Sequence, residues 1–191
     1  GSDVRTPSTH RQLEPFSPFF YDLEGLTETL ELRSAQNHRV LSSFDVPKYV
    51  STPDLLKYVP DAKWLPTLTN AALWEDLPSA QIGRRKLVVL HVPSRSALKG
   101  TDSIRKAMRI LDAEGLIHYM EAERVPYKDM PALVASADVV VDQVSMGLYG
   151  IASVEAMLAG RIAVAQAGSF IRDSVKAETG WDLPIVEATP Q

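Results

Sequence analysis

Two cations and a glycine follow one of the most apolar runs of the sequence. Arg95 and Lys99 come shortly after Lys86–Val92, a run typical of a buried strand, and Lys99 directly precedes Gly100. In an α/β fold, such a position puts positive charge and free helix amides at the carboxyl edge of the sheet. That combination suits a diphosphate, although a solvated surface lysine explains the same residue without a ligand.

A second stretch combines glycine with a carboxylate. Gly147 and Gly150 allow close backbone approach, so the amides of Tyr149, Gly150 and Ile151 could bind a phosphate or a sugar. Glu155 lies one turn into the helix that starts near Gly150, where its carboxylate could accept hydrogen bonds from ribose hydroxyls. A tight turn and a favourable helix dipole would account for the same residues without a ligand.

The elements around this second stretch predict a βαβ crossover. Val139–Val141 is a β-branched run that favours a strand buried on both faces, and a helix with apolar residues at helical spacing follows the glycine turn. Gly160 ends this helix, and Ile162–Ala165 forms the next strand. The carboxyl end of the first strand is where open α/β sheets bind anionic ligands.

Strand and helix patterns alternate five times, which predicts a doubly wound, Rossmann-like parallel sheet with helices on both faces. The remaining predicted elements are strands at Lys86–Val92, Ile117–Val125 and Leu183–Ala188, and helices at about Thr101–Glu114, after Asp129, and from a Ser169 cap through Val175. Leu183–Ala188 is expected at an edge because Pro184 lies at its start. His91, within the first strand, is expected to be a satisfied core histidine.

The segment GLYGIASVEAMLAGRIAVA resembles the signature of GT-B-type retaining glycosyltransferases of family 4. That signature reads Glu-Gly-Phe-Gly, four residues, Glu-Ala-Met-Ala, then Gly-Lys-Pro-Val. Tyr149 stands for the aromatic residue and Glu155 begins the second acidic motif, whereas Gly147 holds the position of the first glutamate. The resemblance extends to LHVPSRSALKGTD upstream and more loosely over most of the chain.

The resemblance implies metal-independent transfer of a sugar from a UDP- or GDP-sugar donor, with retention and without a cofactor. Lys99, with Arg95, would neutralise the departing diphosphate, and Glu155 would bind the nucleotide. Val125 corresponds to the backbone contact for the base. The function of the missing glutamate near the donor sugar would fall to another group or be absent. The acceptor would be a sugar, a lipid or another small molecule.

The same resemblance predicts the organisation of the chain. Residues 1–66 would be the end of an acceptor-binding domain, the N-terminal remnant of a second α/β domain, followed by a linker at 67–84 and the donor-binding domain at 85–191. GSDVR at the start resembles the segment after the family's catalytic histidine, so we expect the isolated chain to bind nucleotide without transferring sugar. Phe16, Phe19, Phe20 and Tyr21 would pack as loop residues or face an acceptor cleft.

Within the first 66 residues, the short apolar runs Arg39–Leu41 and Lys48–Val50 favour strands. Thr52-Pro53 favours the start of a one-turn helix, with proline at its first position.

Composition excludes several classes of function. The formal net charge of −4 argues against a nucleic-acid partner. No apolar run approaches the length of a membrane span, and no signal-peptide pattern is present, so we expect a cytoplasmic protein. The chain has no cysteine, and its four histidines show no metal-ligand spacing. Two alternatives stay open: a sugar-nucleotide epimerase of similar shape, and a degenerate, non-catalytic interaction module.

Overall fold

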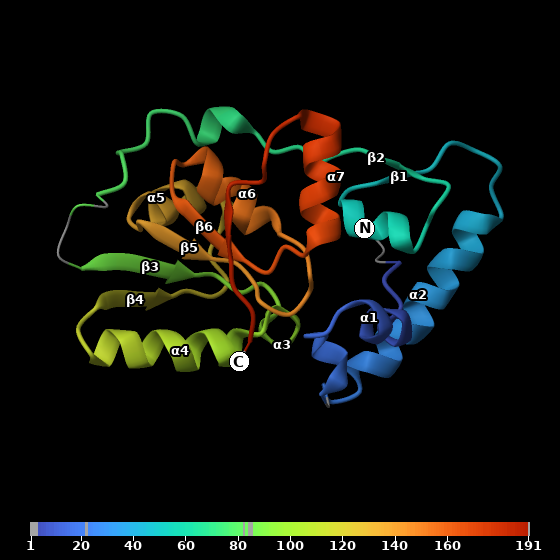
Figure 1. Ribbon diagram of the computed structural model, residues 1–191, viewed down its shortest axis with the longest axis horizontal. Coiled ribbons are helices and arrows are strands. Elements are labelled where there is room, and N and C mark those ends of the chain that lie inside the picture. Colours follow the sequence, from blue (N-terminus) through green and yellow to red (C-terminus); the bar gives the residue numbers. More distant parts are fainter. Residues whose placement is uncertain (1–3, 22, 82, 84–85, 191) are drawn as a thin grey trace.

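The β-branched run Val139–Val141 forms the middle of a five-stranded parallel sheet (Figure 1). The computed structural model describes residues 4–21, 23–81, 83 and 86–190. The strand order is β4-β3-β5-β6-β7, with Leu90 opposite Val140 and Val140 opposite Ala163. The strands are β3 (Leu87–His91), β4 (Ile117–Glu121), β5 (Val139–Val141), β6 (Ile162–Ala165) and β7 (Ile185–Glu187).

Helices cover both faces of this sheet, as predicted for a doubly wound fold. The step from β3 to β4 runs opposite to the later steps, so right-handed crossovers place α4 on one face and α5, α6 and α7 on the other (Figure 1). The helices of this unit are α3 (Ser96–Lys99), α4 (Thr101–Ala113), η4 (Tyr127–Asp129), α5 (Met130–Ala135), α6 (Ile151–Leu158) and α7 (Ser169–Thr179).

The reversal of direction lies between β3 and β5. Chains leaving the carboxyl ends of these neighbouring strands turn to opposite faces, and this leaves room for a ligand between them. The loop at residues 92–100 follows β3 and the loop at 142–150 follows β5. The fold therefore brings together the two stretches that carry the predicted site residues.

Small side chains let α6 pack closely on the sheet. Ala156 of α6 and Ala163 of β6 are fully buried beside Leu90 and Val140 in the main core. Burial of such apolar area contributes about 25 cal/mol per Å², and the close approach leaves little freedom for the start of α6 to shift.

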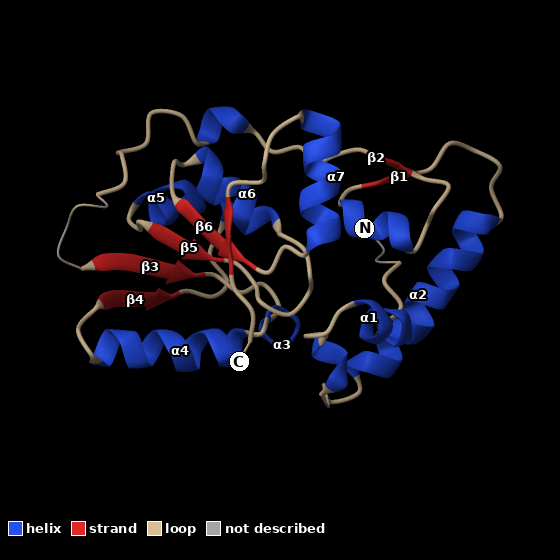
Figure 2. Ribbon diagram, in the orientation of Figure 1, coloured by secondary structure: helices blue, strands red, loops and turns tan. Residues whose placement is uncertain are grey.

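The N-terminal unit contains a second parallel pair of strands and its own small core (Figure 2). Val50, Leu55 and Val59 form that core together with Val4. The 3₁₀-helix expected after Thr52 is present, with proline in its first turn. The elements are α1 (Pro7–Leu13), η1 (Pro18–Phe20), α2 (Leu26–Ser42), β1 (Tyr49–Val50), η2 (Pro53–Lys57) and β2 (Lys63–Trp64).

Several predicted elements differ in detail. Arg39–Leu41, interpreted as a strand-forming run, lies in the last turns of α2, where Leu41 packs against the small core. The strand predicted over Ile117–Val125 ends at Glu121, because β3 ends opposite it at His91. The side chains of Asp129 and Ser169 cap no helix: the N-cap of α7 is Gly168, and the Asp129 side chain makes no capping bond.

The predicted linker packs against the sheet unit. Residues 67–84 include η3 (Ala71–Leu73), and Trp74 is buried in the main core. The Gln81 amide donates to Asp138 Oδ1 at 2.9 Å. The boundary predicted at residues 84 and 85, like Gly1-Ser2, lies outside the described residues, and the division into domains stays a prediction.

Candidate functional site

Lys99 joins the two loops at the carboxyl edge of the sheet. It is the last residue of α3, and its Nζ donates to Asp142 Oδ1 at 2.6 Å. The Asp142 side chain is fully buried, whereas the Lys99 side chain keeps 16% of its surface exposed. The Val144 amide also donates to the Lys99 carbonyl at 3.0 Å. The ammonium is thus held in place yet remains reachable from solvent.

Asp142 also holds the start of α6. Its Oδ2 accepts from the Gly150 amide at 2.6 Å and from the Ser153 hydroxyl and amide at 2.8 and 3.3 Å. Burial works to raise the pKa of Asp142, but Lys99 and these donors outweigh burial and hold that pKa below its ordinary value. Asp142 is therefore ionised at neutral pH, and it positions both the cation and the helix.

Glu155 lies beside this ion pair. It is 3% exposed, and its pKa is raised by burial and by the negative charge of Asp142, while Lys99 acts in the opposite direction. No described residue donates a hydrogen bond to its carboxylate. The structure thus brings together Lys99 and Glu155, two of the predicted site residues. The negative charge of Asp142 attracts Lys99 and repels the Glu155 carboxylate. We call these three residues the Lys99 cluster.

Two other predicted site residues lie apart from the cluster. Arg95 is the exposed N-cap of α3, and within the described part of the chain it makes no ion pair with the cluster. Val125 is half-buried in the loop between β4 and η4. Both lie in loops at the carboxyl edge of the sheet.

Two buried glutamines shape the loop at 142–150. Gln143 Nε2 donates to the carbonyls of Leu148 and Gln166, and its Oε1 accepts from two backbone amides of the same loop. Gln166 Oε1 accepts from the Gly147 amide at 3.0 Å. Because each glutamine spans several backbone groups, the loop has a defined conformation before any ligand binds.

The two glycines of this loop, Gly147 and Gly150, have different structural roles. Gly147 has φ +70°, and a Cβ there would lie 2.2 Å from Glu14 Oε2, so only glycine fits. The Gly150 amide, which the sequence suggests could bind a phosphate or a sugar, donates to Asp142 Oδ2 in this conformation. Tyr149 is half-buried, with a pKa raised by burial and by Asp54, and Ile151 begins α6.

A carboxylate of the N-terminal unit therefore occupies the space where a side chain at position 147 would begin. Glu14 pairs with Lys57 Nζ at 3.2 Å, and burial raises the Glu14 pKa despite that pair. His10 Nε2 lies 3.3 Å from the Met146 carbonyl, which also joins the N-terminal unit to this loop. No local sequence pattern indicates the contacts of Glu14 with Gly147 and of His10 with Met146, because each links residues more than a hundred positions apart.

His91 is a satisfied core residue, as predicted. Its Nδ1 lies 2.8 Å from the Val141 carbonyl and its Nε2 lies 2.9 Å from Thr101 Oγ1, and burial lowers its pKa. Among the described residues, histidines, aspartates and glutamates form no group that could hold a metal ion. No described helix has the length and apolar character needed to cross a membrane.

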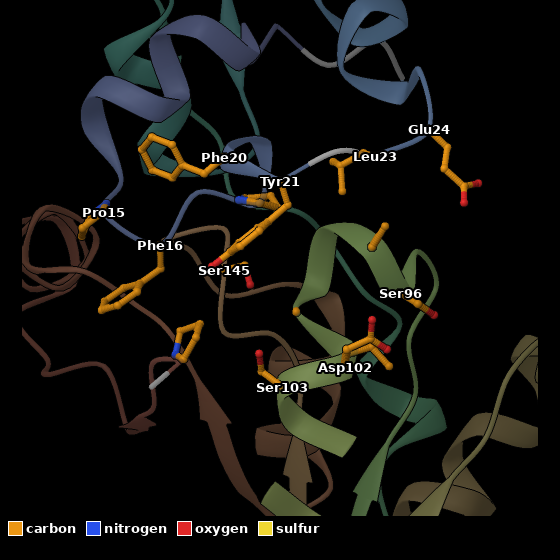
Figure 3. A pocket seen from close by; sticks show the side chains of 15 residues that line it. Pro15, Phe16, Phe20, Tyr21, Leu23, Glu24, Ser96, Asp102, Ser103 and Ser145 are labelled. Carbon is orange, nitrogen blue, oxygen red and sulfur yellow. The ribbon is translucent and has the colours of Figure 1, made fainter. Parts of the chain in front are cut away.

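A cleft of about 670 Å³ opens between the N-terminal unit and the starts of α3 and α4 (Figure 3). Phe16, Phe20 and Tyr21 line it from one unit, and Ser96 and Asp102 from the other. Lys99 and Glu155 do not line this cleft, although Gly100 does. The cleft and the Lys99 cluster are therefore neighbouring but distinct places. We call the first the interlobe cleft.

Comparisons with known proteins identify the fold class. No family model and no curated protein sequence matches the chain. Among solved structures, the chain is similar to sucrose-phosphate synthase from Thermosynechococcus elongatus, with a TM-score of 0.53 and 14% identity. The match covers 91% of this chain and 52% of that one, so this chain spans about half of that protein's length. This likeness concerns the fold alone: the chain has a Rossmann-like α/β fold with a five-stranded parallel sheet.

Proposed function

We propose that this chain is the nucleotide-sugar-binding part of a glycosyltransferase, with the Lys99 cluster as its diphosphate site. The observation that carries the proposal is the Lys99–Asp142 pair beside Glu155, at the reversal point of a glycosyltransferase-like sheet. Ligands of open α/β sheets bind at such a point. The donor would be a UDP- or GDP-sugar, and the family 4 resemblance adds retention of configuration.

Lys99 would hold the diphosphate directly. A lysine ammonium has three N–H donors, of which one faces Asp142, and the side chain is partly exposed. Arg95, exposed at the start of α3, would add a second cation and balance the two carboxylates of the cluster.

The first amides of α6 would provide the remaining donors. The first four amides of an α-helix have no partner inside the helix. Gly150 and Ser153 donate to Asp142, so Ile151 and Ala152 are the amides at this end that a phosphate could use. Glu155 would accept from the ribose hydroxyls, and the backbone at Val125 would contact the base.

In the complete enzyme, the bond between the anomeric carbon and the diphosphate oxygen would break as an acceptor hydroxyl oxygen bonds to that carbon, and the hydroxyl proton would pass to the departing diphosphate. Lys99, Arg95 and the α6 amides would stabilise the negative charge that develops on the diphosphate. They perform this role without a metal ion. No protein nucleophile takes part in this proposal.

Isothermal titration calorimetry of the chain with UDP and with GDP tests the proposal. We expect either UDP or GDP to bind. Lys99→Met should weaken that binding about 10- to 100-fold, because one charged hydrogen bond is lost. Lys99→Arg should keep part of the affinity. Lys106→Met, on the exposed face of α4, is the matched control. Unchanged binding in Lys99→Met, with the fold intact by circular dichroism, would favour the non-catalytic interaction module instead.

A further inference from the structure

A groove of about 530 Å³ lies between α4 and the strands β5 and β6, on the face of the sheet that α6 and α7 do not cover. Among the described helices that connect the strands, α4 is the one that runs along this face (Figure 1). Parallel sheets are usually covered by helices on both faces, so a single helix leaves part of β5 and β6 without a cover. We call this space the α4 groove.

Aliphatic side chains form the floor of the α4 groove. Ile104 and Met108 of α4 pack there with Val141 and Val164 of the sheet in a small core. Ile110, further along α4, also lines the groove and is 51% exposed. Covering such apolar surface contributes about 25 cal/mol per Å². None of the described lining residues is aromatic, so the groove suits a flexible hydrocarbon chain better than a flat ring.

The charge of the α4 groove is opposite to that of the interlobe cleft. The cleft has the carboxylates of Glu24 and Asp102 on its walls, and none of its described lining residues is lysine, arginine or histidine. The groove has Lys106 on its wall, and none of its described lining residues is aspartate or glutamate. Ser103, one turn before Lys106, and Thr189, after β7, add hydroxyl groups. Ammonium and hydroxyl groups are hydrogen-bond donors for a carboxylate.

We propose that the α4 groove binds a fatty acid, with its acyl chain along the aliphatic floor and its carboxylate at Lys106. The two parts of such a ligand match the two kinds of lining residue. A volume of about 530 Å³ is within the usual range for small-molecule sites. None of the three residues of the Lys99 cluster lines the groove, so this site is distinct from the proposed nucleotide site.

The length and charge of the groove argue against two other occupants. The residues of α4 that line it extend from Ser103 to Ile110, a rise of about 10 Å along the helix. A docked helix of ordinary length, about three turns, is roughly 16 Å long and would extend beyond the groove. A second copy packed face to face would bring Lys106 and the exposed Arg109 of both copies together, and these like charges repel each other.

NMR titration of the isotope-labelled whole chain with sodium decanoate, below the concentration at which it forms micelles, tests the proposal. We expect saturable shifts of the Ala107 and Val164 amide signals, since both residues line the groove. Decyltrimethylammonium, which has the same hydrocarbon chain and the opposite charge, should bind at least about tenfold more weakly. Decyl phosphate is the third probe, and it should bind no more tightly than decanoate.

Two variants test the two parts of the site. Lys106→Met should weaken decanoate binding about tenfold, because one charged hydrogen bond is lost, and Lys128→Met, exposed outside the groove, is its control. Ala107→Trp fills the groove from an exposed position of α4 and should abolish binding, whereas Ala113→Trp, exposed on the same helix outside the groove, should not. Circular dichroism checks the fold of each variant.

Several results would overturn the proposal: no saturable shift with decanoate, equal or tighter binding of decyltrimethylammonium, or equal losses in the groove and control variants. Tighter binding of decyl phosphate would assign the groove to a phosphate-bearing lipid instead. Concentration-dependent association of the chain, measured by sedimentation velocity and removed by Ala107→Trp, would assign this face to a second copy. Lys99→Met should leave decanoate binding unchanged, so the fatty-acid site and the nucleotide site are tested independently.

Discussion

The loops after β3 and β5 meet at one edge of the sheet but are held in different ways. In the loop at 142–150, the buried side chains of Asp142, Gln143 and Gln166 bond to backbone groups of the loop or the helix that follows. The loop at 92–100 has its cation Arg95 exposed, and Lys99 links it to the other loop through one ion pair and one backbone bond. The helix end is thus preorganised, while the cation-bearing loop depends on its neighbour.

The comparison predicts that Asp142 is the most sensitive position of the two loops. Asp142→Ala leaves the Lys99 ammonium and the start of α6 without their shared acceptor, and we expect a loss of about 3–5 kcal/mol in the free energy of unfolding. Urea denaturation measures it. Asp142→Asn should lose less, because it can still accept from Gly150 and Ser153. Asp102→Ala, at an exposed ion pair, should change stability little; a loss there equal to that of Asp142→Ala would refute the comparison.

Gln143 should be the next most sensitive position of the two loops. Gln143→Leu removes the amide that bonds the Leu148 and Gln166 carbonyls, leaving buried backbone groups unpaired at about 1–3 kcal/mol. Hydrogen exchange should become faster at the amides of Ser145 and Met146, which lose their acceptor, and stay unchanged in β4. Unchanged exchange at these two amides would show that the loop does not depend on its glutamines.

Because Glu14 contacts Gly147, substitutions at these two positions should have coupled effects on the free energy of unfolding. Gly147→Ala introduces a Cβ at φ +70°, which costs about 1–2 kcal/mol in backbone strain, and also brings this Cβ against the Glu14 carboxylate. Glu14→Ala should remove the clash but not the strain. A double-mutant cycle measured by urea denaturation should therefore give a coupling of at least about 0.5 kcal/mol. Strict additivity would mean that Glu14 does not contact Gly147 in solution.

The smallest effect we predict is a gain in stability rather than a loss. Burial and the negative charge of Asp142 raise the pKa of Glu155 above its ordinary value. The folded chain therefore loses stability as the pH rises from the unfolded-state pKa through the folded-state pKa of this group. Glu155→Gln should therefore stabilise the chain slightly at pH 7, and the gain should disappear below about pH 4. Thermal unfolding at both pH values measures it, with the exposed Glu178→Gln as control. A destabilised Glu155→Gln at pH 7 would indicate a structural role for the carboxylate.

Local sequence patterns were sufficient for the architecture of the sheet unit. Buried parallel strands require β-branched runs, and Val139–Val141 and Lys86–Val92 identified β5 and β3 within a residue or two. No apolar stripe marks helix α2, because Leu32 and Val40 are exposed and the residue of this helix that is buried is Ser34. The short apolar run Arg39–Leu41 therefore favours a strand when the sequence alone is considered.

The candidate site was predictable only in part. Lys99 is predicted from its position between a strand and a helix, and Glu155 from its place in the first turn of a helix together with the family 4 resemblance; the structure brings both into one cluster. Asp142 and Gln143 directly follow the predicted strand Val139–Val141, but a strand-end position does not indicate which groups a side chain contacts. Gln166 and Glu14 have no signal of their own, because Gln166 contacts distant backbone groups and Glu14 lies against a glycine. His10 and Met146, for example, lie 136 positions apart. Such contacts follow from the packing of the two units, which no local spacing encodes.

The central claim is that Lys99 recognises a diphosphate, and comparing UDP with uridine, and GDP with guanosine, by calorimetry tests it most directly. In the unmodified chain, the diphosphate form of the preferred base should bind at least tenfold more tightly than its nucleoside. In Lys99→Met, the ratio of the affinities for the diphosphate form and the nucleoside should fall toward one. Glu155→Gln should weaken the binding of both ligands by the same factor. If Lys99→Met still binds the diphosphate form at least tenfold more tightly than the nucleoside, the account is contradicted.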